Sequence, residues 1–336
     1  MLLVIGDSNA DAACRLAAFP REGDDQPIDG FAWSSGGAGV NVATAFARLG
    51  GKARLLSRTG IDGAADIALA AAKKAHVHVS HVQRDPAHTT GVCIVIVTPD
   101  AERTFLSHRG ANAHLEMPDA TVWDSVERVH VCGHALLSGA QRTTTLSMLE
   151  EASKRGVPAS LDLCLPLVRE HKAWLRRQLS AFDVVLANEA ELALFTLGDT
   201  DASDDRFDEA VHSIREAVSP RGAGAGTVVV KRGARGSVVV GGSATAVPAF
   251  KVTAIDSTGA GDAYVAAFLF ATIAGQSPVV SACYANAVGA LQTARAGSAD
   301  VLPAHGEVAA FLDERGAESE GAVKIPPHPW WRPYEP

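Results

Sequence analysis

This 336-residue sequence has few cysteines and no long apolar run, and each absence narrows its class. The five cysteines include no CxxC pair and no metal-type spacing, so we expect incidental thiols in a reducing compartment. The longest strongly apolar stretch, residues 263–274, is too short to span a bilayer, and the N-terminus carries no basic leader of a signal peptide. We therefore expect a cytoplasmic protein without a membrane partner.

The charge balance and the phosphate-binding motifs exclude further classes. A net charge of -8 without a face dense in Lys and Arg argues against nucleic acid as a partner. No GxxxxGK[ST] sequence is present, which excludes a Walker loop. GGAGVN (36–41) begins like GxGxxG, but Asn41 takes the place of the third glycine. An NAD(P)-dependent oxidoreductase, with Asp62 as the ribose ligand, stays open only as a disfavoured alternative.

Hydrophobic periodicity predicts alternating strands and helices through most of the chain. Short apolar runs predict strands at 2–6, 53–60, 76–82, 128–133, 159–163, 183–189 and 227–240. Helical spacing predicts helices at 39–49, 63–75, 140–155, 168–180, 189–197, 204–218 and 279–295. Repeated strand–helix units predict an α/β fold with a mostly parallel sheet between two helical layers.

Two segments do not fit this alternation, and the C-terminus has a composition of its own. Residues 10–35 are irregular, and residues 89–108 predict a hairpin that turns at Pro99-Asp100. We expect the two segments, about 10–35 and 89–110, to pair as a small β lid on a single domain that spans 1–315. Residues 316–336 are rich in proline and aromatics, which predicts an extended or disordered tail.

Polar groups near the first strand predict a site for a hydroxylated ligand. Gly36, Gly37 and Gly39 allow a ligand to approach the main chain, and the Asn41 amide both donates and accepts. Asn9 and Asp11 lie just beyond the first strand, where open α/β sheets bind ligands. A tight turn with a helix cap, and a solvated loop aspartate, are the simpler alternatives.

The stretch AIDSTGAGDAYVAAF (254–268) places polar chemistry before an apolar helix. The free amides at Gly259, Ala260 and Gly261 and the helix dipole favour an anion such as phosphate. Asp262, in the first turn, is positioned to accept a proton from a hydroxyl that attacks phosphorus. The alternatives are a helix-start carboxylate for Asp262 and a plain turn for 256–258.

Two further segments fit a nucleotide site. ANEAEL (187–192) ends a predicted strand with Asn188 and Glu191, which suit hydrated Mg²⁺ near phosphates. VVKRGARG (229–236) offers Lys231, Gly233 and Gly236 for a phosphate or ribose contact. A capping asparagine with surface glutamates and a β-turn are the alternatives.

In combination these segments resemble the ribokinase (PfkB) family of carbohydrate and nucleoside kinases over residues 2–303. The resemblance rests on residues 36–50, 187–191, 231–236 and 256–268, in the family's order and separation. It implies a three-layer ribokinase-like fold with a β lid. It also implies an ATP-dependent kinase that phosphorylates a primary hydroxyl of a small sugar. A nucleoside kinase of the same fold and a non-catalytic sugar-sensing protein are the alternatives.

The resemblance also implies a role for each matching residue. Asp262 is the general base, and Gly259, Ala260 and Gly261 line the anion hole. The sugar contacts are Asn9, Asp11, Gly37 and Asn41, and the nucleotide contacts are Asn188, Lys231, Gly233, Gly236 and Asn286. Glu191 holds Mg²⁺ through water, and Asp256, with carbonyls near Gly297, holds a monovalent cation such as K⁺ in members that use one. Many members form dimers through the lid.

Departures from the family pattern bear on the substrate. Ribose kinases of the family carry Lys where this chain has Ala38, which weakens a ribose assignment. The sequence DLCLP keeps Asp162 but lacks the arginine that sugar-acid kinases place after it. Arg103 or Arg109 of the hairpin is the substitute, and Arg109 is the expected substrate contact. The motifs at 107–112 favour a neutral sugar or a nucleoside.

Overall fold

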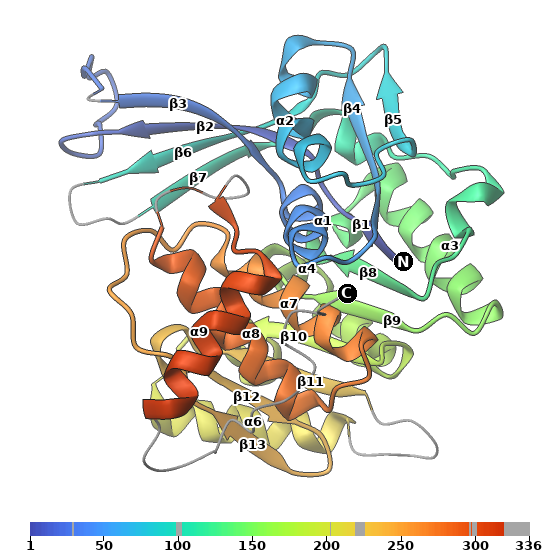
Figure 1. The fold of residues 1–336 in the computed structure, drawn as a ribbon. Coiled ribbons are helices and arrows are strands. Elements are labelled where there is room, and N and C mark those ends of the chain that lie inside the picture. The colour runs from blue at the N-terminus through green and yellow to red at the C-terminus, as the bar shows by residue number, and fades with distance from the viewer. Residues whose placement is uncertain are drawn as a thin grey trace.

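A nine-stranded sheet forms the centre of the computed structural model, which describes residues 1–28, 30–98, 103–201, 203–218, 226–295, 297 and 301–318 (Figure 1). Its strand order is β13-β12-β11-β10-β9-β8-β1-β4-β5. The pairs from β5 to β11 are parallel, and β12 and β13 are antiparallel additions. The strands are β1 (Leu2–Ile5), β4 (Ala53–Gly60), β5 (Val82–Asp85), β8 (Arg128–Cys132), β9 (Ala159–Asp162), β10 (Val184–Asn188), β11 (Thr227–Lys231), β12 (Ser237–Val240) and β13 (Ala244–Val247).

Helices cover both faces of this sheet, so its central strands are apolar on both sides. In β1, Leu2 and Val4 pack into one core, and Leu3 and Ile5 pack into the other. The first core lies under α1 (Ala38–Arg48), α2 (Gly63–Lys74), α7 (Ala260–Ile273), α8 (Pro278–Thr293) and α9 (His305–Glu318). The second lies under α3 (Gly139–Lys154), α4 (Leu165–Gln178), α5 (Glu189–Thr196) and α6 (Asp204–Val218). The predicted three-layer architecture is confirmed.

A second sheet of four strands extends from one end of the main sheet (Figure 1). Its order is β3 (Gly30–Gly36), β2 (Asn9–Arg15), β6 (Gly91–Val97) and β7 (Arg103–His108). Residues 10–35 and 89–108 therefore pair as predicted, although the turn expected at 99–100 lies outside the described residues. We call this sheet the lid.

The buried Asn112 side chain fastens the base of the lid. It lies in η1 (Gly110–His114), and its Oδ1 accepts the Ser8 backbone N–H at 2.8 Å. Its Nδ2 donates to the Asn9 Oδ1 at 3.0 Å and to the Arg109 carbonyl at 3.1 Å. One side chain thus joins the inner ends of β2 and β7.

One predicted strand is wrong, and two elements were missed. Residues 76–82 do not form the predicted strand, because the Val77 N–H is taken by the Ala72 carbonyl at the end of α2. Only His78 bridges to Arg54, and the edge strand β5 starts at Val82. The short strand β13 and helix α9 were not predicted, and α9 runs to Glu318, past the expected domain end at 315. The rest of the predicted tail, 319–336, and the loop 219–225 lie outside the described residues.

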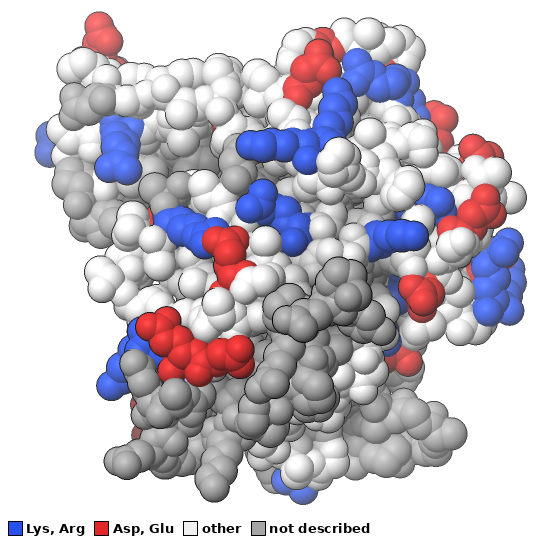
Figure 2. Space-filling view, viewed as in Figure 1, with Lys and Arg blue, Asp and Glu red and all other residues white. Residues whose placement is uncertain are grey.

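Figure 2 shows Lys and Arg side chains in small groups among acidic and uncharged residues on the visible face. Across the described ranges, no helix combines the length and the apolar character that crossing a membrane requires.

Candidate active site

The carboxyl ends of the central strands bring the predicted site residues to one edge of the sheet. In the sheet β1 lies between β4 and β8, so the strand order reverses at β1, which is where open α/β sheets bind ligands beyond the carboxyl ends of their strands. Asp7 follows β1, and His134 follows β8 in η3 (Gly133–Leu136). Asp162 and Lys231 end β9 and β11 at the same edge.

The first turn of α7 faces α1 across this edge. Gly259 caps the helix in the left-handed conformation (φ 71°), which glycine adopts without strain. The Asn41 Nδ2 donates to the Asp262 Oδ2 at 2.8 Å, so the two predicted signature regions meet. Burial raises the pKa of Asp262 to about 6, and Asp162 adds to the rise, whereas Asn41 and Lys231 oppose it. Asp262 is therefore a mostly buried carboxylate whose pKa lies well above the usual value for aspartate.

The lid places a second carboxylate opposite Asp262. Burial, with a smaller contribution from the Asp262 charge, raises the pKa of Asp11 to about 7. Gly36 leaves room for this side chain, because a Cβ at Gly36 would lie 2.0 Å from the Asp11 Oδ2. The Asp11 Oδ1 and the Asn41 Oδ1 are buried without a hydrogen-bond partner among the described residues. The hydroxyl donors of a ligand would satisfy these two acceptors.

The two other predicted sugar contacts have structural roles. The Asn9 Oδ1 accepts from Asn112 at the base of the lid. Gly37 caps α1 with φ 88°, and a Cβ there would lie 2.4 Å from the Asp7 carbonyl oxygen. Gly37 therefore lets α1 start directly against the end of β1, which sets the position of Asn41.

Arg109 forms an ion-pair network with residues that the sequence analysis did not select. Its Nε and Nη2 donate to the two Asp7 oxygens at 3.2 and 3.1 Å. Gln141 donates to the Asp7 Oδ1 at 2.8 Å and accepts from Arg109. His134 lies nearby, where burial lowers its pKa and the Asp7 charge opposes that shift. Asp7 and His134 each follow a predicted strand, a signal that could have found them.

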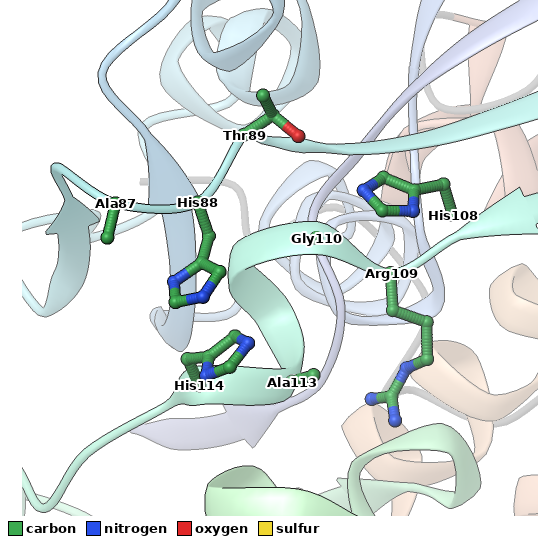
Figure 3. Close-up of a pocket in the computed structure, with 8 residues that line it drawn as sticks. All are labelled: Ala87, His88, Thr89, His108, Arg109, Gly110, Ala113 and His114. Atoms are coloured by element: carbon green, nitrogen blue, oxygen red, sulfur yellow. The ribbon is translucent and has the colours of Figure 1, made fainter.

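Arg109 also borders a pocket of about 450 Å³ at the base of the lid (Figure 3). His88 and His114 stack there with ring centroids 3.5 Å apart, and His108 lies on the side of Arg109. In Figure 3 the Arg109 side chain points away from the stacked rings. Arg109 therefore lies between this pocket and the Asp7 network, and Asp7 itself does not line the pocket.

Lys231 brings a positive charge to the start of α7. Its Nζ donates to the Asp162 Oδ1 at 2.7 Å, and a Cβ on Gly261 would lie only 3.8 Å from that nitrogen. Burial lowers the pKa of Lys231, but Asp162 and Glu191 raise it more, so the net shift is upward. A charged ammonium group thus lies against the free amides of α7.

Glu191 and Asn188 form a capping box at the start of α5. The Asn188 Oδ1 accepts the Glu191 N–H, and the Glu191 Oε2 accepts the Asn188 N–H, both at 2.8 Å. The capping alternative for Asn188 is therefore present. Glu191 is buried rather than on the surface, and burial and the Asp162 charge raise its pKa to about 7 against the pull of Lys231.

The other predicted nucleotide residues differ in what surrounds them. A Cβ at Gly236 (φ 85°) would lie 2.1 Å from the Val247 carbonyl oxygen, and the Asn286 Nδ2 donates to the Val247 and Pro248 carbonyls at 3.0 Å. Gly236 and Asn286 therefore hold the segment that leads from β13 toward α7. Gly233 (φ 54°) has open space beside it.

A family comparison decides what kind of protein carries this site. The profile described as pfkB family carbohydrate kinase matches residues 1–305. The chain belongs to the pfkB family of carbohydrate kinases. The predicted family is thereby confirmed, and the chain is a sugar kinase of that family.

Individual relatives span nearly the whole of this PfkB kinase. An ATP-dependent ribose-1-phosphate kinase from Halopiger xanaduensis is 29% identical over 94% of this chain and 98% of its own. A ribokinase from Haemophilus influenzae is 26% identical, with 93% and 98% covered. The structure of Arabidopsis thaliana ribokinase complexed with ribose and ATP has a TM-score of 0.78 at 23% identity, covering 93% of this chain and 98% of that one. The ribokinase-like fold is confirmed.

The remaining predicted residue of this PfkB kinase, Asp256, lies in the loop before α7. Its Oδ1 accepts the Thr258 N–H at 2.7 Å and the Thr258 hydroxyl at 2.6 Å. Its Oδ2 accepts the Gly297 N–H at 3.1 Å. Asp256 thus shapes the turn that leads into Gly259, while Asp262, six residues later, accepts from Asn41 of α1.

Proposed function

We propose that this chain is an ATP-dependent kinase that transfers the γ-phosphate to a primary hydroxyl of a small neutral sugar, with Asp262 as general base. The observation that carries the proposal is the position of Asp262 in the first turn of α7, beside Lys231 and facing Asp11 of the lid. A proton acceptor, an anion-binding helix start and hydroxyl acceptors thus meet at one point.

The proposed mechanism uses positioning and charge. The carboxylate of Asp262 takes the proton of the acceptor hydroxyl as that oxygen attacks phosphorus. The amides of Gly259, Ala260 and Gly261, with the Lys231 ammonium, stabilise the negative charge on the transferred group. Asp11 and Asn41 orient the sugar through its hydroxyls.

Mg²⁺ fits the carboxylates that lie next to Lys231, which are Glu191 and Asp162. In kinases this ion commonly uses one or two carboxylates and takes its other ligands from phosphates and water. Glu191 and Asp162 supply two buried carboxylates of that kind, and no cluster of three or more His, Cys, Asp or Glu side chains suited to a metal occurs in the described ranges. When bound there with ATP, Mg²⁺ would neutralise phosphate charge.

The charges around Asp11 and Asp262 support an uncharged sugar as the substrate that accepts the phosphate. Arg109 is already paired with Asp7, and no cation is paired with Asp11 or hydrogen-bonded to Asp262 among the described residues. An anionic sugar would add negative charge beside these carboxylates. One observation favours a sugar phosphate as second candidate: the Arg109 Nη1 is buried without a described hydrogen-bond partner, and one relative is named a ribose-1-phosphate kinase.

An acceptor screen tests the proposed function. Purified protein with ATP and Mg²⁺ is offered ribose, deoxyribose, fructose, ribose 1-phosphate, a keto-deoxy sugar acid and nucleosides, and ADP formation is followed. We expect a free pentose or hexose to give the highest kcat/KM. A preference for ribose 1-phosphate would overturn the neutral-sugar assignment, and a nucleoside preference would favour the alternative kinase. Absence of turnover on every acceptor would favour a sugar-sensing protein.

The pKa of Asp262 predicts the pH dependence of this reaction. Burial raises that pKa from 3.8 to about 6, and a general base acts only when ionised. The kcat/KM should therefore fall as the pH is lowered from about 7 through about 6, where first Asp11 and then Asp262 take up a proton. A pH–rate profile with a saturating nucleotide measures this limb. A limb that ends near pH 4, the ordinary range of aspartate, would contradict the assignment.

We also propose that the kinase forms a homodimer through the lid. Trp33, Ile94 and Leu106 form a cross-strand row with Ala12 on the face opposite Asp11, and they are 48%, 42% and 52% exposed. Such a row of large apolar side chains is typical of a protein interface. The double variant Trp33→Glu/Ile94→Glu should shift the mass measured by light scattering from dimer to monomer, whereas Ile61→Glu, at an exposed site outside the lid strands, should not. A wild type that is monomeric at assay concentration would refute the proposal.

A further inference from the structure

The loop before α7 is tied to the loop after α8 by one buried glutamine, Gln292. Its Nε2 donates to the Thr258 carbonyl at 3.2 Å and to the Gly297 carbonyl at 2.9 Å. An amide nitrogen carries two N–H groups, so both are used. The side chain is fully buried in the last turn of α8.

These bonds close a ring around the amide nitrogen. Gly297 donates to the Asp256 Oδ2, and its carbonyl accepts from Gln292. Thr258 donates twice to the Asp256 Oδ1, and its carbonyl accepts from Gln292. The Thr293 carbonyl accepts the N–H groups of Ile255 and Asp256 at 2.7 and 3.1 Å. Carboxylate and carbonyl oxygens thus converge, and each is met by an N–H or O–H donor of the chain.

A dissolved monovalent cation does not fit this ring as it stands. Such a cation replaces its water shell with carbonyl and carboxylate oxygens. Asp256 and carbonyls near Gly297 are the oxygens that the family resemblance assigns to it, and the Gln292 amide already bridges the Gly297 carbonyl to the Thr258 carbonyl. A cation between them would have to displace a side chain that is itself buried and doubly bonded.

The ring controls the catalytic end of α7. Thr258 immediately precedes Gly259, whose left-handed backbone aims the first amides of α7, and Asp262 follows within one turn. A shift of the Thr258 carbonyl therefore moves the proposed anion hole relative to the base. Gln292 is a positioning residue, because it acts through this loop without contacting the reacting groups.

We infer that Gln292 does within the chain what a bound monovalent cation would otherwise do, so this kinase needs neither K⁺ nor Na⁺ for activity. The prediction for activity rests on the proposed function. The prediction for thermal stability does not, because the ring is a property of the folded chain. Attachment to α8 makes the bridging donor permanent, whereas a dissolved cation would dissociate.

The wild-type protein gives the primary test. Activity and thermal unfolding are compared in KCl, NaCl and tetramethylammonium chloride at equal ionic strength. We expect kcat to agree within about twofold among the three salts and the melting temperature to be unchanged, since a ligand that does not bind cannot stabilise. Activation by K⁺ of severalfold, or a melting temperature raised by K⁺ and not by tetramethylammonium, would overturn the inference.

The variant Gln292→Ala tests the equivalence. Removing the amide leaves the Thr258 and Gly297 carbonyls without their donor, so in tetramethylammonium chloride kcat should fall by about 10- to 100-fold. Addition of K⁺ should recover part of the loss and raise the melting temperature of this variant alone. The control Gln276→Ala removes a glutamine between α7 and α8 that bonds only weakly, to the Ala274 carbonyl at 3.4 Å, and should match wild type.

The outcomes separate the two proposals. A folded Gln292→Ala variant that loses activity and ignores K⁺ would refute the equivalence. If no acceptor is phosphorylated, the proposed function fails, and the salt dependence of the melting temperatures still decides the inference. If Gln292→Ala does not fold, the wild-type salt comparison alone decides it.

Discussion

The substitution Asp262→Asn should reduce kcat by about a thousandfold or more while ATP binding stays within about twofold. The change keeps the shape of the side chain and removes its ability to accept a proton. Asn41, which donates to the Asp262 Oδ2 at 2.8 Å, can still donate to the amide oxygen, so the start of α7 should stay in place. Steady-state kinetics with the best acceptor, together with titration of ATP·Mg²⁺ by calorimetry, measures both quantities.

The control for this experiment is Asp66→Asn. Asp66 is an exposed aspartate in the first turn of α2 and pairs only with Lys73 at the surface. Like Asp262 it lies in the first turn of a helix, but it is not among the residues of the proposed site. Near-normal turnover of Asp262→Asn would show that Asp262 only caps its helix, as the simpler reading of the sequence allowed.

The same variant should be more stable than wild type. The pKa of Asp262 is raised to about 6 in the folded chain, so the unfolded chain gives up this proton more readily. Ionisation therefore destabilises the fold as the pH rises from 3.8 to about 6, by on the order of 2–3 kcal/mol at neutral pH. Asparagine removes this penalty, so the melting temperature should rise at pH 7 and change little at pH 4. Equal melting curves at pH 7 would contradict the burial argument.

The second large effect is expected for Lys231→Met. Methionine keeps the apolar stem and removes the ammonium that lies 2.7 Å from Asp162 and faces Gly261. We expect kcat to fall by about a hundredfold or more, because one donor to the developing charge is lost. Stability should fall as well, since the Asp162 and Glu191 carboxylates are left buried beside each other without their counter-charge.

A double variant separates these two consequences. In Lys231→Met/Asp162→Asn one of the two uncompensated charges is removed and Glu191 no longer has a charged neighbour at Asp162, so the melting temperature should recover part of the way toward wild type while kcat stays low. Lys73→Met, at an exposed lysine of α2, controls for loss of a surface charge. Recovery of kcat in the double variant would show that Lys231 serves only to neutralise Asp162.

The parts of the fold that follow from local pattern could be read from the sequence. Short apolar runs such as residues 2–5 and 184–187 indicate strands that are covered on both faces, and both form such strands. The strand expected at 76–82 failed because its alternation is local, whereas the amides of residues 75–77 are used by the end of α2. Asp262 and Asn41 could be selected as candidate site residues because each lies in a short motif with its own chemistry, and the structure brings the two side chains together.

The rest of the site depends on contacts between distant segments. Gln141 reaches Asp7 across 134 positions, and its place in the first turn of α3 carries no sign of that partner. Gln292 lies on a helix made mostly of small apolar residues, where one polar side chain predicts neither its burial nor its partners. Arg109 was selected as a substrate contact, and the ion pair with Asp7 becomes visible only when η1 is placed over the end of β1.

The Asn112 side chain fixes the base of the lid beside the proposed sugar contacts Asn9 and Asp11. The inner ends of β2 and β7 are held at one point by a single amide, while the strands extend away from the body of the kinase. The proposed dimer face and the proposed sugar contact Asp11 lie on opposite faces of the same strand, β2. We therefore expect assembly through the lid and affinity for the sugar to depend on each other.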